Sequence, residues 1–367
     1  MVGVKMNTRR TLLKMMAALG VLAVTPLGWA DAEESLVMPD ESTPQERVWV
    51  AFAASRAIWG RSFQEVQATI GRLVRAMTPF TPVTVLCRPG EEVLARRLCG
   101  ESNTRFIPVA LDDIWVRDSG GVFVRDGDGL ALVDFNFNGW GEKQEHASDS
   151  RLAAAVARAS GARHLRANIT GEGGGIEVDG EGTAIMTESC WRNDNRNPGV
   201  ARAELEAELK GLLGLRKIIW LPGIKGRDIT DAHVDFYARF VRPGVVVVNL
   251  DNDPDSHDYA VTREHLAILQ GARDADGRAL QLHLLPPPRQ PRDNRFSRSP
   301  DFAAGYINYL PINGAVVVPR FGDPEADVHC QTLLGALYPG RKIVPVDIDP
   351  VAAGGGGIHC ITLHQPS

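Results

Sequence analysis

The 367-residue sequence has few cysteines, and none of them form a C-x-x-C pair. This argues against a zinc site built from cysteines. The five cysteines, at positions 87, 99, 190, 330 and 360, are an odd number, so at least one thiol stays unpaired even in an oxidising compartment. Cys87 and Cys99 are the nearest pair in sequence and form a candidate disulfide. Residues 45–366 also lack linker-like and low-complexity segments, so we expect a folded chain.

Long apolar runs are absent except near the start of the chain. TRRTLLK (residues 8–14) precedes an apolar run over residues 15–27, and Gly28-Trp29-Ala30 follows it. Because this run is shorter than the ~20 residues that span a bilayer, it predicts a cleaved twin-arginine export signal over residues 1–30. An N-terminal membrane anchor is the alternative. We therefore expect residues 31–367 to form one catalytic domain that is periplasmic or secreted.

An excess of basic residues is also lacking. Without residues 1–30 the chain has 36 Lys and Arg against 45 Asp and Glu, a net charge of −9. A field of that sign repels nucleic acid and attracts small cations. We expect a small cationic substrate, no nucleic-acid partner and no stable membrane insertion after signal cleavage, and a homo-oligomer is compatible with the sequence.

What the sequence does contain is a recurring hairpin signal. Two short apolar strands flank a turn in GVFVRDGDGLALVDFNFN, IEVDGEGTAIMT, ARFVRPGVVVVN and NYLPINGAVVVP. Helical patterns lie between them, including an S-F-Q-E capping box at Ser62 that leads into an apolar stripe. The repeat predicts an α/β fold made of similar modules in a ring, which RVWVAF (residues 47–52) and IHCITLH (residues 358–364) would close as strands.

Cys360 stands out because the run Gly354–Gly357 precedes it. A free cysteine is most often a small buried hydrophobe. Four glycines, however, are tolerated mainly where φ is positive or where something approaches the backbone closely. We therefore interpret Cys360 as a candidate nucleophile at the start of the last strand.

Acidic residues and a histidine interrupt the other predicted strands. Asp118 follows Trp115 in DDIWVRDSGG, and Glu172 precedes three glycines in GEGGGIEVDG. In DITDAHVDF, His233 and Asp235 alternate, which places them on one face of a strand. The neighbouring acids at 112 and 113 are typical loop-capping residues.

Carboxylates near a thiol raise its pKa and weaken it as a nucleophile. A cationic substrate reverses this effect. A guanidinium offers planar N–H donors that match carboxylate oxygens, and its charge favours the thiolate. These residue types together predict a hydrolysis by covalent catalysis, in which the thiolate attacks the guanidinium carbon, ammonia leaves after protonation by His233, and water then attacks.

The chain resembles agmatine deiminases and the related bacterial-type peptidylarginine deiminases, which are guanidine-modifying enzymes of the pentein fold. The resemblance rests on WVRDSG, FNFNGWG, EGGGIEVDGEGT, RNDNRNP, DAHVDF, VVVPRFGDPEAD and GGGGIHCIT, in this order over about residues 38–366. It implies a single-domain, five-module, pseudo-symmetric α/β propeller. It also implies that agmatine is hydrolysed to N-carbamoylputrescine and ammonia without a cofactor or metal.

The resemblance further implies a role for each site residue. Cys360 would be the nucleophile, His233 the general acid and base, and Glu172 the residue that orients the histidine. Asp118 and Asp235 would bind the guanidinium nitrogens. Trp115 would pack against the substrate stem.

Four positions depart from the family pattern: Gly175 and Glu177 stand where serine and histidine are usual, Gly357 where asparagine is usual, and Ala53 where proline is frequent. Glu177 and Gly357 lie beside proposed site residues. Together with the export signal they keep peptidyl-arginine open as an alternative substrate.

Two other functional classes also stay open. Zinc bound by His233, Asp235, His359 and Cys360 would make the protein a metallohydrolase, although no His-rich zinc spacing is present. A guanidine-binding protein without activity is the other class. Asp251, Asp253 and Asp255 resemble a calcium loop, but Pro254 and the lack of the required glycine favour a capped loop.

Overall fold

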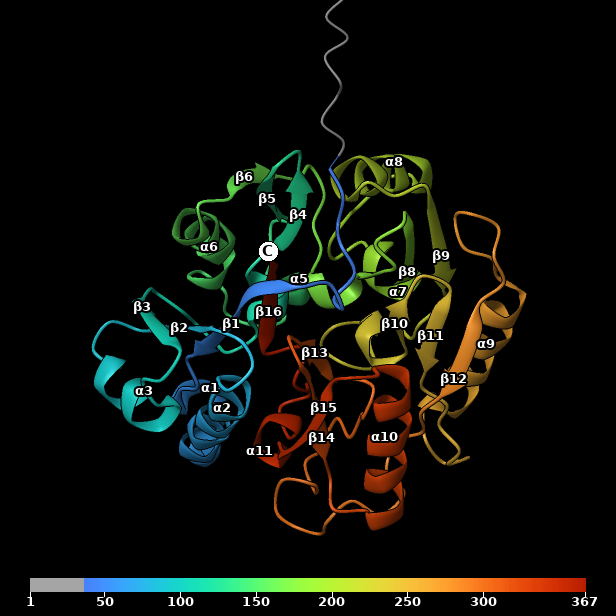
Figure 1. The fold of residues 1–367 in the computed structure, drawn as a ribbon. Coiled ribbons are helices and arrows are strands. Elements are labelled where there is room, and N and C mark those ends of the chain that lie inside the picture. Colours follow the sequence, from blue (N-terminus) through green and yellow to red (C-terminus); the bar gives the residue numbers. More distant parts are fainter. Residues whose placement is uncertain (1–35) are drawn as a thin grey trace, which may run out of the picture. The chain divides into compact units, whose positions relative to one another are not determined.

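One structural module recurs through residues 36–367, the part of the chain that the computed structural model describes (Figure 1). In four of the five modules two antiparallel strands form a hairpin, a helix crosses over, and a third strand pairs parallel to the second. The export signal predicted over residues 1–30 lies outside the described residues. Within residues 36–367 no helix is long and apolar enough to cross a membrane.

Four modules follow each other in chain order. The first comprises β4 (Val122–Asp126), β5 (Gly129–Asp134), α6 (Leu152–Ser160) and β6 (Arg163–Arg166). The second comprises β7 (Glu177–Val178), β8 (Thr183–Thr187), α8 (Arg202–Leu213) and β9 (Lys217–Leu221). The third comprises β10 (Ala238–Arg242), β11 (Val245–Val248), α9 (Asp258–Gly271) and β12 (Gln281–Leu284). The fourth comprises β13 (Leu310–Ile312), β14 (Ala315–Arg320), α10 (Pro324–Leu337) and β15 (Lys342–Asp347). All four predicted hairpins are confirmed.

The fifth module joins the two ends of the described chain. It contains β1 (Gln45–Phe52), α2 (Phe63–Met77), β2 (Val83–Cys87), α3 (Glu92–Cys99), β3 (Thr104–Pro108) and the C-terminal β16 (Thr362–Pro366). β16 pairs antiparallel with β1, and β1 pairs parallel with β2. The C-terminal strand thus takes the place of the first hairpin strand and closes the ring, as predicted.

Apolar residues fill the interior of each module. β11 is four consecutive valines, all of them buried, as is typical of strands that are covered on both faces. The predicted apolar stripe of α2 is also buried. The prediction of a capping box at Ser62 was wrong. Gly60–Ser62 form a 3₁₀ turn that runs into α2, and the Ser62 side chain makes no capping hydrogen bond.

Candidate active site

The segments that lead into the first strand of three of the modules meet at a central pocket. Asp118 lies in the short helix α4 (Val116–Ser119) ahead of β4, and His233 and Asp235 precede β10. Cys360 precedes β16. All four line one pocket, together with Trp115. Because the modules repeat, equivalent segments of the chain arrive at the same central place.

Cys360 is held in the turn before β16, two positions short of the strand in which it was predicted. Its side chain is buried, and Asn308 Nδ2 donates to Sγ at 3.4 Å. Sγ also lies 3.6 Å from Asp235 Oδ2. Burial raises the pKa of Cys360 well above its usual value, and the negative charges of Asp235 and Asp118 raise it further. The residue is therefore a neutral thiol until a positive charge enters the pocket.

The glycines before Cys360 make room mainly for aromatic rings of the protein itself. A Cβ at Gly354 would lie 2.3 Å from Trp59 Cη2, and one at Gly356 would lie 2.2 Å from Trp115 Cζ3. The backbone of residues 354–356 does line the pocket. The missing side chains thus leave space for the two indoles, while the glycine backbone itself borders the pocket.

His233 lies between two carboxylates. Its Nε2 is 3.1 Å from Glu172 Oε2, and its Nδ1 is 3.6 Å from Asp118 Oδ1. Burial lowers the pKa of His233, but the anionic neighbours, with Asp118 first among them, hold it well above the usual value. An imidazolium held in this way can deliver a proton to a leaving amine.

The strand predicted for His233 and Asp235 was wrong. Val234–Phe236 form a 3₁₀ turn, and β10 begins only at Ala238. The chain bends sharply just before, where Asp231 and Ala232 have φ of 61° and 70°. Such backbone costs about 1–3 kcal/mol per residue. Hydrogen bonds from two side chains of the neighbouring module, those of Ser189 and Thr187, reach the carbonyls of Asp231 and Ala232 and hold the bend.

Glu172 is fully buried and paired with a cation. Arg196 Nε donates to its Oε1 at 2.8 Å, while Arg196 Nη1 lies 2.6 Å from Asp231 Oδ2. Burial alone would raise the pKa of Glu172, but Arg196 and then His233 lower it below the usual value. Arg196 thus connects Glu172, which contacts His233, with Asp231, which lies in the bend just before His233.

The two pocket carboxylates differ in their partners. Asp118 accepts the Trp140 indole N–H at 3.0 Å, and burial raises its pKa to about 6, with Glu172 and Asp235 adding to the effect of burial and His233 opposing it. Asp235 Oδ2 bonds His359 Nδ1 at 2.7 Å. Asp235 Oδ1 is buried and has no hydrogen-bond partner among the described residues. An unpaired buried acceptor of this kind is suited to a donor from a ligand.

Trp115 forms an aromatic wall of the pocket with its indole fixed from behind. Its Nε1 donates to Asp113 Oδ2 at 2.9 Å, and Trp59 Nε1 bonds the other oxygen of Asp113 at 2.6 Å. Asp113 therefore holds two indoles rather than capping a loop. Asp112 does cap a loop, as expected, by accepting the backbone N–H groups of residues 148 and 149.

The alternative zinc ligands do not come together as a metal site. His359 is bonded on one side to Asp235 and on the other to Glu41 Oε1, at 2.8 Å. Of the described residues, the only group of three possible ligands with all ligand atoms within 4.8 Å of one another is Glu172, Cys190 and His233. In the loop at Asp251, successive Asp side chains accept the N–H two residues ahead, which confirms a capped loop. All five cysteines are free and buried, so the candidate disulfide of Cys87 and Cys99 was wrong.

Residues 37–366 match the model of the Porphyromonas-type peptidyl-arginine deiminase family. The chain belongs to this family. It is 40% identical to a putative agmatine deiminase of Streptomyces coelicolor, over 90% of this chain and 98% of the relative. It is 35% identical to an agmatine deiminase of Pseudomonas aeruginosa, over 90% of this chain and 95% of the relative.

Solved structures agree with this assignment. The agmatine deiminase of Enterococcus faecalis matches with a TM-score of 0.86 and 29% identity, covering 91% of this chain and 96% of that one. A substrate-bound agmatine deiminase of C. jejuni matches with a TM-score of 0.81 and 25% identity, covering 90% and 96%. The expected family and five-module pentein fold are confirmed, and the protein is an agmatine deiminase family hydrolase that acts on amidines.

The positions that depart from the usual deiminase pattern lie outside the pocket lining. Glu177 accepts Arg239 Nε at 2.7 Å and the N–H of Phe240 at 2.8 Å, so it belongs to a buried charge network between modules. A Cβ at Gly357 would lie 2.3 Å from Asn308 Oδ1, and asparagine there would displace Asn308. Ala53 is buried in the core.

Several residues of this deiminase site escaped sequence reasoning. Arg196 and Trp140 stand in the motif blocks RNDNRNP and FNFNGWG, which carried no chemical interpretation for them. For Asn308, the only sequence feature that could have indicated a role in the site is its position just before a predicted hairpin. Glu41, near the start of the described chain, accepts from Arg117, Arg239 and His359 at 2.6–2.8 Å.

Proposed function

We propose that the protein is an agmatine deiminase, which hydrolyses agmatine to N-carbamoylputrescine and ammonia. The observation that carries the proposal is the convergence of Cys360, His233, Asp118 and Asp235 on one pocket with the unpaired Asp235 Oδ1. A guanidinium there satisfies that acceptor. The names of relatives at 35% identity support the same substrate.

The reaction begins with substrate-assisted ionisation of the nucleophile. Asp118 and Asp235 accept N–H bonds from the guanidinium, whose positive charge offsets the carboxylates that otherwise keep Cys360 as a thiol. The thiolate then attacks the guanidinium carbon, and a tetrahedral adduct forms.

His233 then acts as the acid. It gives a proton to one amino group of the adduct, and ammonia leaves as the C–N bond breaks, so that the remaining carbon is held as a thiouronium on Cys360. A water molecule attacks this carbon and loses a proton to His233. The C–S bond breaks, and the product leaves with one oxygen from water in place of one nitrogen.

The walls of the pocket suit the butyl stem of agmatine. Trp115, Trp140, Ile229 and Phe236 line the same pocket as the reacting groups. The wider cavity outside it shares several of these residues and carries five further aspartates, Asp228, Asp251, Asp253, Asp258 and Asp301, against three arginines. A net acidic approach attracts a dication.

That outer cavity, of about 1270 Å³, also favours a second candidate, peptidyl-arginine. A peptide could lie in the cavity while an arginine side chain reaches Cys360. Export through the signal predicted over residues 1–30, which we also propose, would bring the enzyme into contact with peptides.

Ammonia release from agmatine, free arginine and a peptide with an internal arginine tests the choice when measured side by side. We expect kcat/KM to be highest for agmatine. A peptide value about tenfold above that for agmatine, equal to about 1.4 kcal/mol of differential transition-state binding, would reverse the assignment. Activity that is lost on chelation would instead support a metallohydrolase.

A further inference from the structure

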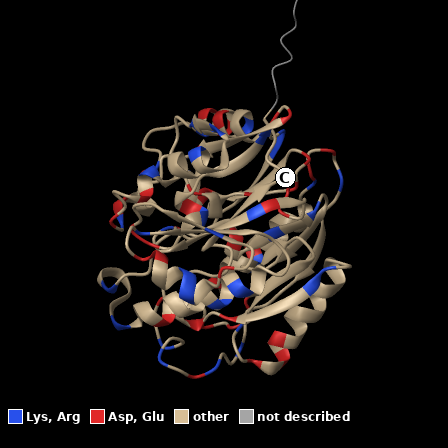
Figure 2. Cartoon of the chain, turned by 60° about the vertical axis from the view of Figure 1, so that its left-hand side comes forward, with Lys and Arg blue, Asp and Glu red and all other residues tan. Residues whose placement is uncertain are grey.

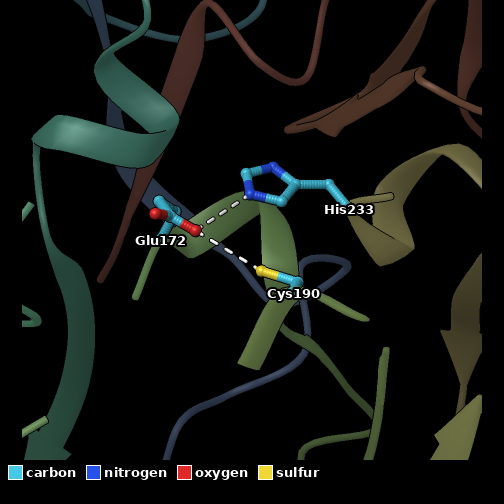
Figure 3. Close-up of side chains that lie close together, drawn as sticks. All are labelled: Glu172, Cys190 and His233. Carbon is cyan, nitrogen blue, oxygen red and sulfur yellow. Dashed lines mark hydrogen bonds and ion pairs between the residues drawn. The ribbon is translucent and has the colours of Figure 1, made fainter. Parts of the chain in front are cut away.

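Cys190 is a buried thiol beside the acid–base pair that the proposed reaction does not use. It comes from the short helix α7 (Glu188–Trp191), and its side chain is fully buried. Its Sγ lies 3.4 Å from Glu172 Oε2, the same oxygen that lies 3.1 Å from His233 Nε2 (Figure 3). A thiol, an imidazole nitrogen and a carboxylate oxygen thus face one point.

The distances between Cys190 Sγ, Glu172 Oε2 and His233 Nε2 fit those between the ligand atoms of a thiophilic divalent cation. Zinc binds oxygen and nitrogen at about 2.0–2.2 Å and sulfur at about 2.3 Å in tetrahedral geometry, which places ligand atoms roughly 3.3–3.8 Å apart. The separations of 3.1 and 3.4 Å lie close to that range, and all three atoms lie within 4.8 Å of one another. Small side-chain shifts complete three ligand positions and leave the fourth for water.

The residues behind the three ligands support the same interpretation. Arg196 Nε lies 2.8 Å from Glu172 Oε1 and 3.1 Å from Oε2, and this contact fixes the carboxylate with Oε2 toward Cys190 and His233. The other ring nitrogen of His233 lies 3.6 Å from Asp118 Oδ1. A second carboxylate behind a ligating histidine, and a hydrogen bond to the free oxygen of a ligating carboxylate, are regular features of metal sites.

Charge is also conserved at the site. When a divalent ion binds, the Cys190 thiol releases one proton and the His233 imidazolium releases another. Two positive charges enter as two protons leave, so the net charge of the buried site does not change.

We propose that Glu172, Cys190 and His233 form an inhibitory site for a thiophilic divalent cation such as Zn²⁺ or Cd²⁺. The bound ion occupies His233 Nε2 and the Glu172 oxygen that faces it, so that His233 is no longer free to transfer protons. Of the three residues, His233 is the one that lines the pocket. The inhibition rests on the proposed deiminase function, whereas binding of the ion does not.

The binding test uses Cys360→Ser protein, in which the thiol in the pocket lining is absent. Titration with Cd²⁺ is followed by calorimetry and by the ultraviolet absorption of cadmium–thiolate bonds. We expect one ion per chain with thiolate absorption. Adding Cys190→Ala should weaken binding at least ~10-fold and abolish the absorption, because the soft ligand is gone. Adding Cys330→Ala, a matched removal of another buried thiol, should change neither. Cadmium absorption that persists without Cys190 would overturn the proposal.

The inhibition test compares the parent enzyme with Cys190→Ala and Cys190→Ser, each relative to its own metal-free rate. We expect the half-inhibitory Zn²⁺ concentration to rise at least ~10-fold in Cys190→Ala. Unchanged sensitivity would place the ion on Cys360 and refute the site. Should Cys190→Ala fail to fold, Cys190→Ser keeps the test, because it should lose cadmium sensitivity more than zinc sensitivity. Cys190-dependent binding by a protein without deiminase activity would refute the proposed function and leave the metal site standing.

Discussion

Replacing Glu172 by glutamine tests the proposed role of this residue most directly. The substitution keeps the shape of the side chain but removes its charge and turns one oxygen into a donor. Arg196, His233 and Cys190 all direct donors at the carboxylate. At least one of these donors then faces the amide N–H of the glutamine and has no acceptor. The His233 imidazolium also loses the anion that helps to hold its pKa high.

The structure sets the size of the expected effects. Breaking a buried ion pair costs about 3–5 kcal/mol, and we expect the low end of this range because Arg196 keeps Asp231 at 2.6 Å. Catalysis should suffer more than binding, since Glu172 does not line the pocket. We expect kcat to fall ~10²–10⁴-fold, the usual range for disabled acid–base catalysis, while KM changes less than about tenfold.

The assay is steady-state ammonia release from agmatine with kcat and KM determined separately, together with chemical denaturation. Glu177→Gln is the matched control, because Glu177 is also buried and also bonded to an arginine, but outside the pocket. It should lower stability and leave kcat nearly intact. Equal losses of kcat in the two variants would show that Glu172 acts through stability alone. A change confined to KM would assign Glu172 to substrate binding.

The remaining predictions concern the nucleophile, pH, the charge network and export. Cys360→Ser should lower ammonia release at least ~10³-fold, and substantial residual turnover would exclude the thiol mechanism. Because Asp118 has a pKa of about 6 and must be charged to bind a guanidinium, kcat/KM should fall as pH drops through about 6; a fall only near pH 4 would contradict this. The pKa of Glu41 is lowered well below its usual value, since Arg117 and its other cationic neighbours outweigh the opposing effect of burial, so its contribution to stability is present above pH ~4.5 and is lost as pH falls through the lowered pKa. Glu41→Gln should flatten that acid transition in denaturation curves and cost about 3 kcal/mol near neutral pH. Lysine at both Arg9 and Arg10 should keep the protein in the cytoplasm on cell fractionation, and unchanged export would refute a twin-arginine signal.

Basic and acidic residues are spread along the whole of the described chain (Figure 2), and several of them are buried. The buried network of Glu41, Arg117, Arg239 and Glu177 connects the beginning of the described chain to three other modules. Through His359 it reaches Asp235, one of the pocket carboxylates. Glu41 therefore takes part both in contacts between modules and, through His359, in holding Asp235.

The sequence by itself determined the modules. Each hairpin is signalled by a local turn between two apolar strands, such as the residues between β4 and β5, and such turns depend only on neighbouring residues. The motif blocks likewise identified Asp118, Glu172, His233, Asp235 and Cys360 as site residues, and the structure brings them together.

Tertiary structure decided what each of these residues touches. Asn308 reaches Cys360 and Arg196 reaches Asp231 across module boundaries, and no local pattern encodes such contacts. The glycines before Cys360 accommodate Trp59 and Trp115, which lie far from them in the sequence. Residues Val234–Phe236 alternate like a strand but form a 3₁₀ turn, because hydrogen bonds from the preceding module hold a bend that isolated residues would avoid. Local preference fixes a turn or a strand, whereas packing between modules fixes the geometry in which the reacting groups meet.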